Sequence, residues 1–184
     1  MSTRGILLLA GLFALAFVLL AAGKCGYAKI ESIQTMENAI AQVRRDFPRV
    51  KPASTKTVEL YQASSMTLLI VDARTEAEFA VSHLPGALHF TKVAEVAEAV
   101  DSMDKKPDTV LVYGALGFRS AEFAEKLQRG KVANVEHLEG GIFQWANEGL
   151  PLVEPAGEPT KVVHPYNKLW GRLLNENLRY EPEE

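Results

Sequence analysis

The sequence predicts an α/β fold in three layers, in which a central parallel sheet carries helices on both faces. Two observations lead to this prediction. Residues 68–71 and 109–113 form short apolar runs, which are typical of parallel strands buried on both faces. Between residues 50 and 153, runs of this kind alternate with segments that favour helix, which is the pattern of repeated β-α units.

The expected elements follow one another in β-α order along this stretch. Strands are expected at residues 50–54, 68–71, 87–90, 109–113 and 135–138. Helices are expected at residues 55–63, 76–81, 93–102, 120–129 and 142–148. We therefore place a single domain at residues 50–154, a length that can bury a core of ordinary size.

The N-terminal part contains an uncharged apolar run from Gly5 to Gly23, which predicts a hydrophobic helix. Its length lies between the roughly 7–15 residues of a signal-peptide core and the roughly 17–25 residues of a spanning helix. Residues 1–28 are thus expected to be a signal peptide cleaved after Ala28, or an uncleaved transmembrane anchor. Either one predicts a membrane-anchored or exported protein, with the periplasmic or other extracytoplasmic side favoured.

Two further segments flank the domain. Apolar residues recur every three or four positions between Ile30 and Phe47, which predicts an amphipathic linker helix within residues 29–49. Residues 155–184 are expected to form a proline- and glycine-rich linker followed by a C-terminal amphipathic helix and tail. An apolar stripe marks that helix, formed by Tyr166, Leu169, Trp170, Leu173 and Leu174. Such a stripe packs on the parent domain, docks a partner or lies on a membrane surface.

Composition and charge exclude several functions. The net charge of −3 and the lack of a basic run give no basis for nucleic-acid binding. The single cysteine, Cys25, can form neither an internal disulfide nor a thiolate metal site. The four histidines do not have the spacing of metal ligands. We therefore expect no metal and no cofactor.

Three blocks of sequence resemble the rhodanese-like domain family over about a hundred residues. The first is LLIVDARTEAEFAVSHLPGALHF at residues 68–90, which departs from the family pattern at Ser82, where glycine is usual. The second is the loop YGALGFRS at residues 113–120, and the third is LEGGIFQWANEGLP at residues 138–151. Their order and separations resemble those of the family, which implies a rhodanese-like three-layer fold.

The second block departs from the family at its most important position. The family's active-site loop reads C-x-x-G-x-R-S, and its cysteine carries a persulfide during sulfur transfer. Gly117, Arg119 and Ser120 match this pattern, but Gly114 occupies the position of the cysteine. Related cysteine phosphatases have five residues between cysteine and arginine, whereas this loop has four, so the spacing disfavours a phosphatase.

The candidate site is an anion- or ligand-binding loop rather than a catalytic centre. It comprises Gly114, Ala115, Leu116, Gly117, Phe118 and Arg119. A turn between a buried strand and a helix N-terminus points backbone N–H groups at an anion. Three supporting residues are expected: Ser120, Asp72, as a candidate ion-pair partner of Arg119, and Arg74, as a candidate partner of Glu78. We expect Leu116 and Phe118 to be exposed and available to a partner protein.

The resulting hypothesis is a catalytically inactive rhodanese-like domain that acts as a binding or scaffold module. It is expected to bind a protein partner, a small anion, or both, and to be tethered to a membrane or exported. The alternative is a component of a sulfurtransferase whose reacting thiol is supplied by a partner protein. A third interpretation is a structural part of a membrane complex that contacts its neighbours through the terminal helices.

Overall fold

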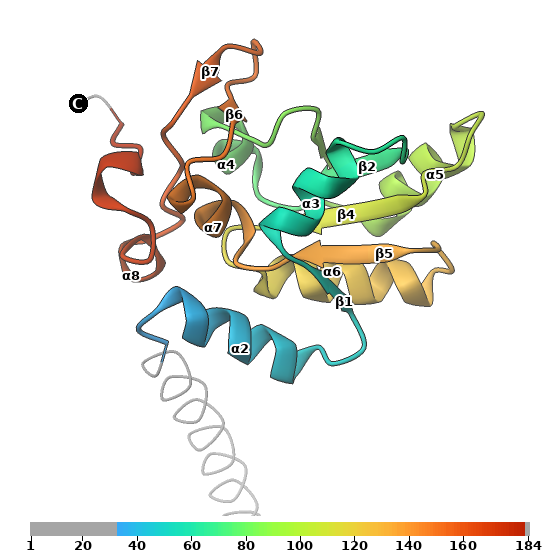
Figure 1. Ribbon diagram of the computed structural model, residues 1–184, viewed down its shortest axis with the longest axis horizontal. Coiled ribbons are helices and arrows are strands. Elements are labelled where there is room, and N and C mark those ends of the chain that lie inside the picture. The colour runs from blue at the N-terminus through green and yellow to red at the C-terminus, as the bar shows by residue number, and fades with distance from the viewer. Residues whose placement is uncertain (1–32, 183–184) are drawn as a thin grey trace, which may run out of the picture. The chain divides into compact units, whose positions relative to one another are not determined.

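The computed structural model describes residues 33–182 (Figure 1), and the predicted segment at residues 1–28 lies outside them. The strands are β1 (Lys51–Ala53), β2 (Leu68–Asp72), β3 (Leu88–His89), β4 (Thr109–Tyr113), β5 (Val135–Leu138), β6 (Leu152–Val153) and β7 (Pro159–Thr160). The helices are α2 (Met36–Asp46), α3 (Thr55–Gln62), α4 (Glu76–Val81), α5 (Val93–Ser102), α6 (Phe118–Arg129), α7 (Gly141–Asn147), α8 (Lys168–Gly171) and the 3₁₀ helix η1 (Glu176–Leu178).

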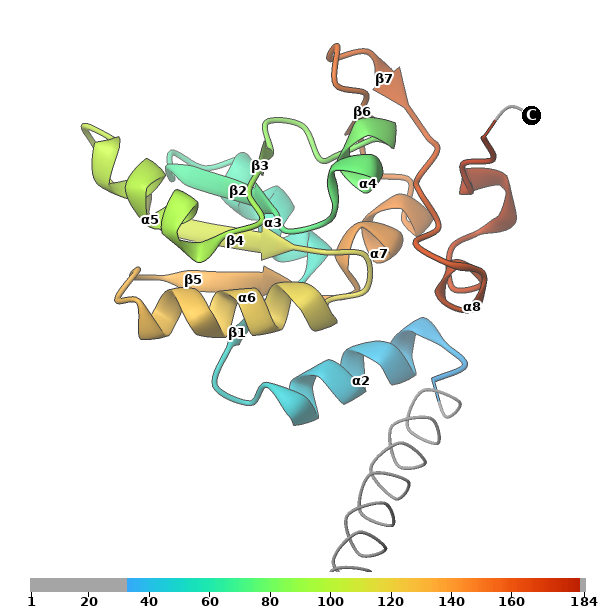
Figure 2. The ribbon, with the colours of Figure 1, turned by 180° about the vertical axis from the view of Figure 1, so that it is seen from behind.

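The central sheet is parallel throughout, with strand order β1-β5-β4-β2-β3. Helix α3 covers one face, and α5 and α6 cover the other, as the two opposite views show (Figures 1 and 2). The three-layer α/β prediction is therefore confirmed. Since all strands run the same way, their carboxyl ends meet at one edge of the sheet, which is where ligands bind in open parallel sheets.

The apolar runs of the sequence form the core. One cluster fills the space between the sheet and the α5–α6 layer: Val50, Leu69, Val71, Ala73, Val96, Val110, Val112, Phe123, Ala124, Leu127 and Val135. All five residues of β4 are buried, because this central strand is covered on both faces. The end of β4 is thereby fixed in position, and the loop that follows it begins from a rigid support.

The amphipathic linker helix was expected within residues 29–49, and α2 forms a helix over residues 36–46 of that segment. The Thr35 side chain caps its start by accepting a hydrogen bond from the Asn38 N–H. Ala39 and Val43 face inward and are fully buried. The part of the expected linker helix before residue 33 lies outside the described residues.

The C-terminal segment differs from the single amphipathic helix predicted for it. Helix α8 has only four residues, because the Leu173 and Leu174 N–H groups bond to carbonyls three positions back and the chain turns. This turn buries both leucines on the domain, so the predicted packing of the apolar stripe holds although its helical form does not. The expected linker before it contains a short hairpin, since β6 pairs antiparallel with β7. In residues 33–182, no helix is both long and apolar enough to cross a membrane.

Candidate functional site

The predicted ligand loop joins β4 to α6 at the carboxyl edge of the sheet. Helix α6 starts at Phe118, two positions earlier than expected, and Gly117 caps it in a left-handed conformation with φ of 107°. A non-glycine residue is strained in that conformation, so this glycine is needed for the loop to enter the helix. Ser120 is fully buried, and its hydroxyl donates to the Gly117 carbonyl over 3.0 Å, which ties the first turn of the helix to the loop.

The loop leaves a run of backbone donors without acceptors. Within residues 33–182, no carbonyl or side chain accepts a hydrogen bond from the backbone N–H groups of residues 115–120. A Cβ atom placed on Gly114 would lie 3.5 Å from the Ser120 nitrogen, so a side chain at this position would start beside these donors. Free N–H groups at a helix N-terminus, together with the helix dipole, favour a negative charge.

Helix α7 holds the loop from its other side. The Gly114 carbonyl accepts a hydrogen bond from the Ile142 N–H at 2.9 Å, and the Ala115 carbonyl accepts one from the Phe143 N–H at 3.1 Å. A Cβ atom on Gly141 would come within 2.2 Å of the Gly114 oxygen. This explains the second glycine of the pair in the third sequence block, because only glycine at position 141 allows α7 to approach the loop this closely.

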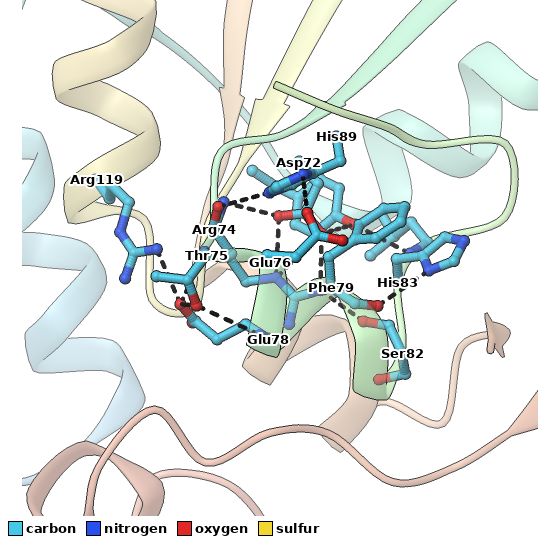
Figure 3. Close-up of polar contacts among 12 residues, drawn as sticks. Asp72, Arg74, Thr75, Glu76, Glu78, Phe79, Ser82, His83, His89 and Arg119 are labelled. Atoms are coloured by element: carbon cyan, nitrogen blue, oxygen red, sulfur yellow. Dashed lines mark hydrogen bonds and ion pairs between the residues drawn. The ribbon is translucent and has the colours of Figure 1, made fainter. Parts of the chain in front are cut away.

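Arg119 forms its ion pair with a different carboxylate from the one predicted. Its Nη1 donates to Glu78 Oε2 over 2.9 Å, whereas the candidate partner was Asp72 (Figure 3). The predicted pairing of Arg74 with Glu78 is also wrong, because Arg74 pairs with Asp72 at 2.7 Å. The two partners are exchanged since Asp72 and Arg74 are two residues apart and both are fully buried, while Glu78 faces α6. Arg119 therefore forms an ion pair with a buried carboxylate, as expected, but the carboxylate is that of Glu78.

Asp72 is the centre of a buried network behind the loop. It accepts hydrogen bonds from the Arg74 backbone and guanidinium and, at 2.5 Å, from the Tyr113 hydroxyl. Burial and the adjacent Asp72 carboxylate raise the pKa of Tyr113 well above its usual value, so its proton stays on the hydroxyl. Burial lowers the pKa of Arg74, but Asp72 outweighs this effect and the pKa is raised overall. The network ties β2 to β4 and supports the loop.

Glu78 joins this support to the loop. Burial alone would raise the pKa of its carboxyl group, but hydrogen bonds from the Thr75 backbone, the Thr75 hydroxyl and Arg119 hold it below the usual value. A charged Glu78 therefore balances Arg119, and the loop's attraction for an anion comes mainly from its N–H groups.

The C-terminal segment covers the apolar residues of the loop. The rings of Phe118 and Trp170 lie 6.1 Å apart between centroids, and the Arg119 guanidinium lies 5.3 Å from the centre of the Tyr166 ring. Leu116 is buried and Phe118 is half-buried. The expectation that both are exposed is therefore wrong, because residues some fifty positions further along the chain pack against them.

The remaining candidates have structural positions. Trp145 is buried in the core and donates to the Pro151 carbonyl. His83 bridges to Val153 and stacks on Phe79 at 4.0 Å. Ser82, where the family has glycine, is in extended backbone that any residue adopts. Within residues 33–182, no group of three His, Cys, Asp or Glu side chains is arranged to hold a metal ion.

Sequence reasoning missed two contributors to the site. The sequence pairs Glu78 with Arg74 and not with Arg119, and the apolar stripe that contains Tyr166 and Trp170 does not identify the loop as the surface it covers. The apolar stripe is the sequence signal for this cover over the loop. Its periodicity indicates that one face of the segment is buried, but it does not indicate which surface of the domain that face packs against.

Comparisons with known proteins agree with this geometry. Residues 56–148, about half of the chain, match the family model described as "Rhodanese-like domain". A protein of Allochromatium vinosum named "Sulfurtransferase" is 35% identical over 95 residues, which cover 52% of this chain and 87% of that protein. The "Uncharacterized protein YibN" of Escherichia coli K12 is 31% identical over 86 residues, covering 46% of this chain and 60% of YibN.

Solved structures show the same fold. A thiosulfate sulfurtransferase from Pseudomonas aeruginosa matches with a TM-score of 0.54 and 19% identity, covering 72% of this chain and 25% of that chain. At this level of identity the likeness concerns the fold alone.

Proposed function

We propose that this chain, which belongs to the rhodanese-like domain family, is a binding module without sulfurtransferase turnover of its own. Its loop at residues 114–119 receives a small anion or an anionic or persulfidated group of a partner protein. The observation that carries this proposal is Gly114, which places no nucleophile beside the free N–H groups of the loop. In related enzymes a thiolate at this position carries the sulfur, so a loop without one retains binding and lacks the reacting atom.

The surroundings of Gly114 support a lost side chain rather than a remodelled loop. The φ of Gly114 lies outside the left-handed region, so the backbone does not require glycine there. An added Cβ would make only ordinary contacts of 3.5–3.8 Å with Arg119 and Ser120. The binding geometry of the loop is therefore compatible with a cysteine that the chain does not have.

Attachment to a membrane, or export across one, is part of the proposal and rests on the apolar run from Gly5 to Gly23. The mass of the intact protein in membrane and soluble fractions tests it. The mass of the full-length chain in the membrane fraction supports an anchor. The mass of a chain cleaved after Ala28, found in the soluble fraction, supports export. An uncleaved protein found only in the soluble fraction contradicts both.

The turnover assay is transfer of sulfur from thiosulfate to cyanide by the full chain. We expect no rate above the reaction without protein. Gly114→Cys in a Cys25→Ser background is the matched positive variant, because its only thiol stands in the loop. Turnover by the unaltered chain that persists in Cys25→Ser would refute the proposal, since neither cysteine position would then explain the activity.

Anion binding is measured separately, by following backbone amide resonances during a titration with sulfate. We expect saturable shifts concentrated at residues 115–120, whose N–H groups have no acceptor in the described part of the chain. Shifts spread evenly over the surface, or no shifts at all, would remove the anion from the proposed function.

The space at Gly114 also favours one second candidate, in which a partner protein supplies the thiol. A partner's cysteine persulfide would then rest against the same N–H groups. This candidate predicts that sulfur transfer by the partner speeds up when the unaltered chain is added, and that Gly141→Ala, which displaces the loop, removes the effect. A partner rate that is indifferent to the chain would eliminate it.

A further inference from the structure

A pocket lies where the loop meets the C-terminal segment. Its volume is about 140 Å³, and it is lined by Ala115, Leu116, Phe118, Arg119, Tyr166 and Trp170. The lining comes from two parts of the chain that are distant in sequence but held together by the Phe118–Trp170 and Arg119–Tyr166 contacts. The pocket therefore depends on the cover that the C-terminal segment forms over the loop.

The size and lining of the pocket favour a single ring. A protein cavity of about 150 Å³ lined by apolar side chains binds benzene. The volume of the pocket described here is nearly the same as that of the benzene-binding cavity. Phe118 and Trp170 present aromatic surfaces to the space, and Leu116 adds an aliphatic one. Aromatic groups prefer offset or edge-to-face contact with centroids about 4.5–7 Å apart. An aromatic ring can make such contacts with both side chains.

The hydrogen-bond donors at the pocket favour an anionic substituent on that ring. Arg119 is the one ionised side chain in the lining, and only its Nη1 is bonded to Glu78 among the described residues. Its Nε and Nη2 donate to no described acceptor, and its side chain is 33% exposed. Ala115, Leu116 and Phe118 also contribute backbone N–H groups that lack acceptors within residues 33–182. The apolar wall and the donors are therefore provided by the same loop residues.

We infer that this pocket binds a small organic anion with one aromatic ring, of the aryl sulfonate or aryl carboxylate class. The ring lies against Phe118 and Trp170, and the anionic group is held by Arg119 and the N–H groups of the loop. This inference rests on the proposed function, because the loop is the anion site in both. It adds that the chain prefers an aryl anion to an inorganic one.

Calorimetric titration of the full chain, kept in detergent throughout, tests the inference with three probes. Benzenesulfonate has the ring and the charge, methanesulfonate lacks the ring, and benzyl alcohol lacks the charge. We expect benzenesulfonate to bind at least tenfold more tightly than either of the others. Equal affinities for benzenesulfonate and methanesulfonate would overturn the inference while leaving the anion loop of the proposed function in place.

Variants locate the binding. Trp170→Ala is expected to weaken benzenesulfonate at least tenfold and to leave methanesulfonate unchanged, because Trp170 lines the pocket but lies outside the anion loop. Phe118→Ala is a second variant, expected to weaken benzenesulfonate at least tenfold. Leu169→Ala is the matched control, because Leu169 is an exposed neighbour of Trp170 that does not line the pocket. Full affinity in both pocket variants would overturn the inference.

One further probe distinguishes a free ligand from a partner's side chain. N-acetylphenylalanine amide is uncharged and presents a ring as a protein would. Tighter binding of this probe than of benzenesulfonate would assign the pocket to a partner protein and overturn the inference. Failure of all the probes to bind, combined with sulfate shifts at residues 115–120, would also overturn it without touching the proposed function.

Discussion

Replacement of Gly141 by alanine tests how helix α7 holds the loop. Gly141 has a φ of 55°, and alanine in this left-handed conformation costs about 1–2 kcal/mol. The added Cβ would also come within 2.2 Å of the Gly114 oxygen and 2.6 Å of the Ala115 oxygen, so the two segments must separate. Separation breaks the hydrogen bonds from Ile142 and Phe143, each worth about 1 kcal/mol. The expected loss is therefore about 3–4 kcal/mol in the free energy of unfolding.

The chain offers a matched control in Gly149. Its φ is 75°, and an added Cβ would meet no atom within 4 Å, so Gly149→Ala carries the backbone cost alone. Urea unfolding of both variants measures the difference, which we expect to be about 2 kcal/mol. With a urea dependence of about 1–3 kcal/mol per molar, this difference corresponds to about 1 M in the midpoint. If Gly141→Ala is no less stable than Gly149→Ala, the close approach of α7 is not what holds the loop.

Three other predictions concern the same region. Gly114→Ala is expected to keep or raise stability by about 0.5 kcal/mol in urea unfolding, because its Cβ makes ordinary contacts and alanine restricts the unfolded chain; a loss above about 1 kcal/mol would contradict it. Arg119→Leu is expected to cost about 2–3 kcal/mol by leaving the buried Glu78 carboxylate unpaired, and Arg119→Leu with Glu78→Gln is expected to recover part of that loss; additive losses in the double variant would argue against the pair. Burial lowers the pKa of His137 to about 4, below the 6.5 of an exposed histidine, so the unfolded chain binds more protons between these values. Stability from this group is present above pH 6.5 and is lost as the pH falls toward 4, by about 2 kcal/mol between pH 7 and pH 5. His137→Leu should reduce this loss of stability between pH 7 and pH 5, measured by urea unfolding. An unchanged loss would show that the protonation of His137 does not cause it.

The fold could be predicted because its elements have strong local signals. The apolar runs at β2 and β4 have the length and composition of doubly buried strands, and the structure places β4 at the centre of the sheet with β2 beside it. Helix boundaries were displaced where a backbone conformation decides them. Helix α6 begins earlier than expected because Gly117 adopts a positive φ. A glycine in the sequence shows only that a positive φ is permitted at that position, not that the chain adopts it.

The site could be predicted by position but not by its contacts. The loop residues were found because they are contiguous in the chain and match a known spacing. The ion-pair partner of Arg119 could not be predicted, because an ion pair between separate elements depends on the direction in which each side chain points. Glu78 and Asp72 are both acidic residues near the loop, and only the geometry of α4 turns Glu78 toward Arg119. The cover formed by Tyr166 and Trp170 is a long-range contact of the same kind.

The glycine at position 114 has a different physical meaning from the other glycines of the site. Gly117 and Gly141 have positive φ, and an added Cβ on Gly141 would collide with the loop, so the fold depends on them. Gly114 has neither constraint. The loop can therefore keep its shape with a side chain at 114, and the support around it does not depend on which residue stands there. A loop that has its donors, its arginine and its contacts with α7 but no nucleophile at 114 is suited to the binding role that we propose, and the aromatic pocket beside it is the basis for the aryl anion that we infer.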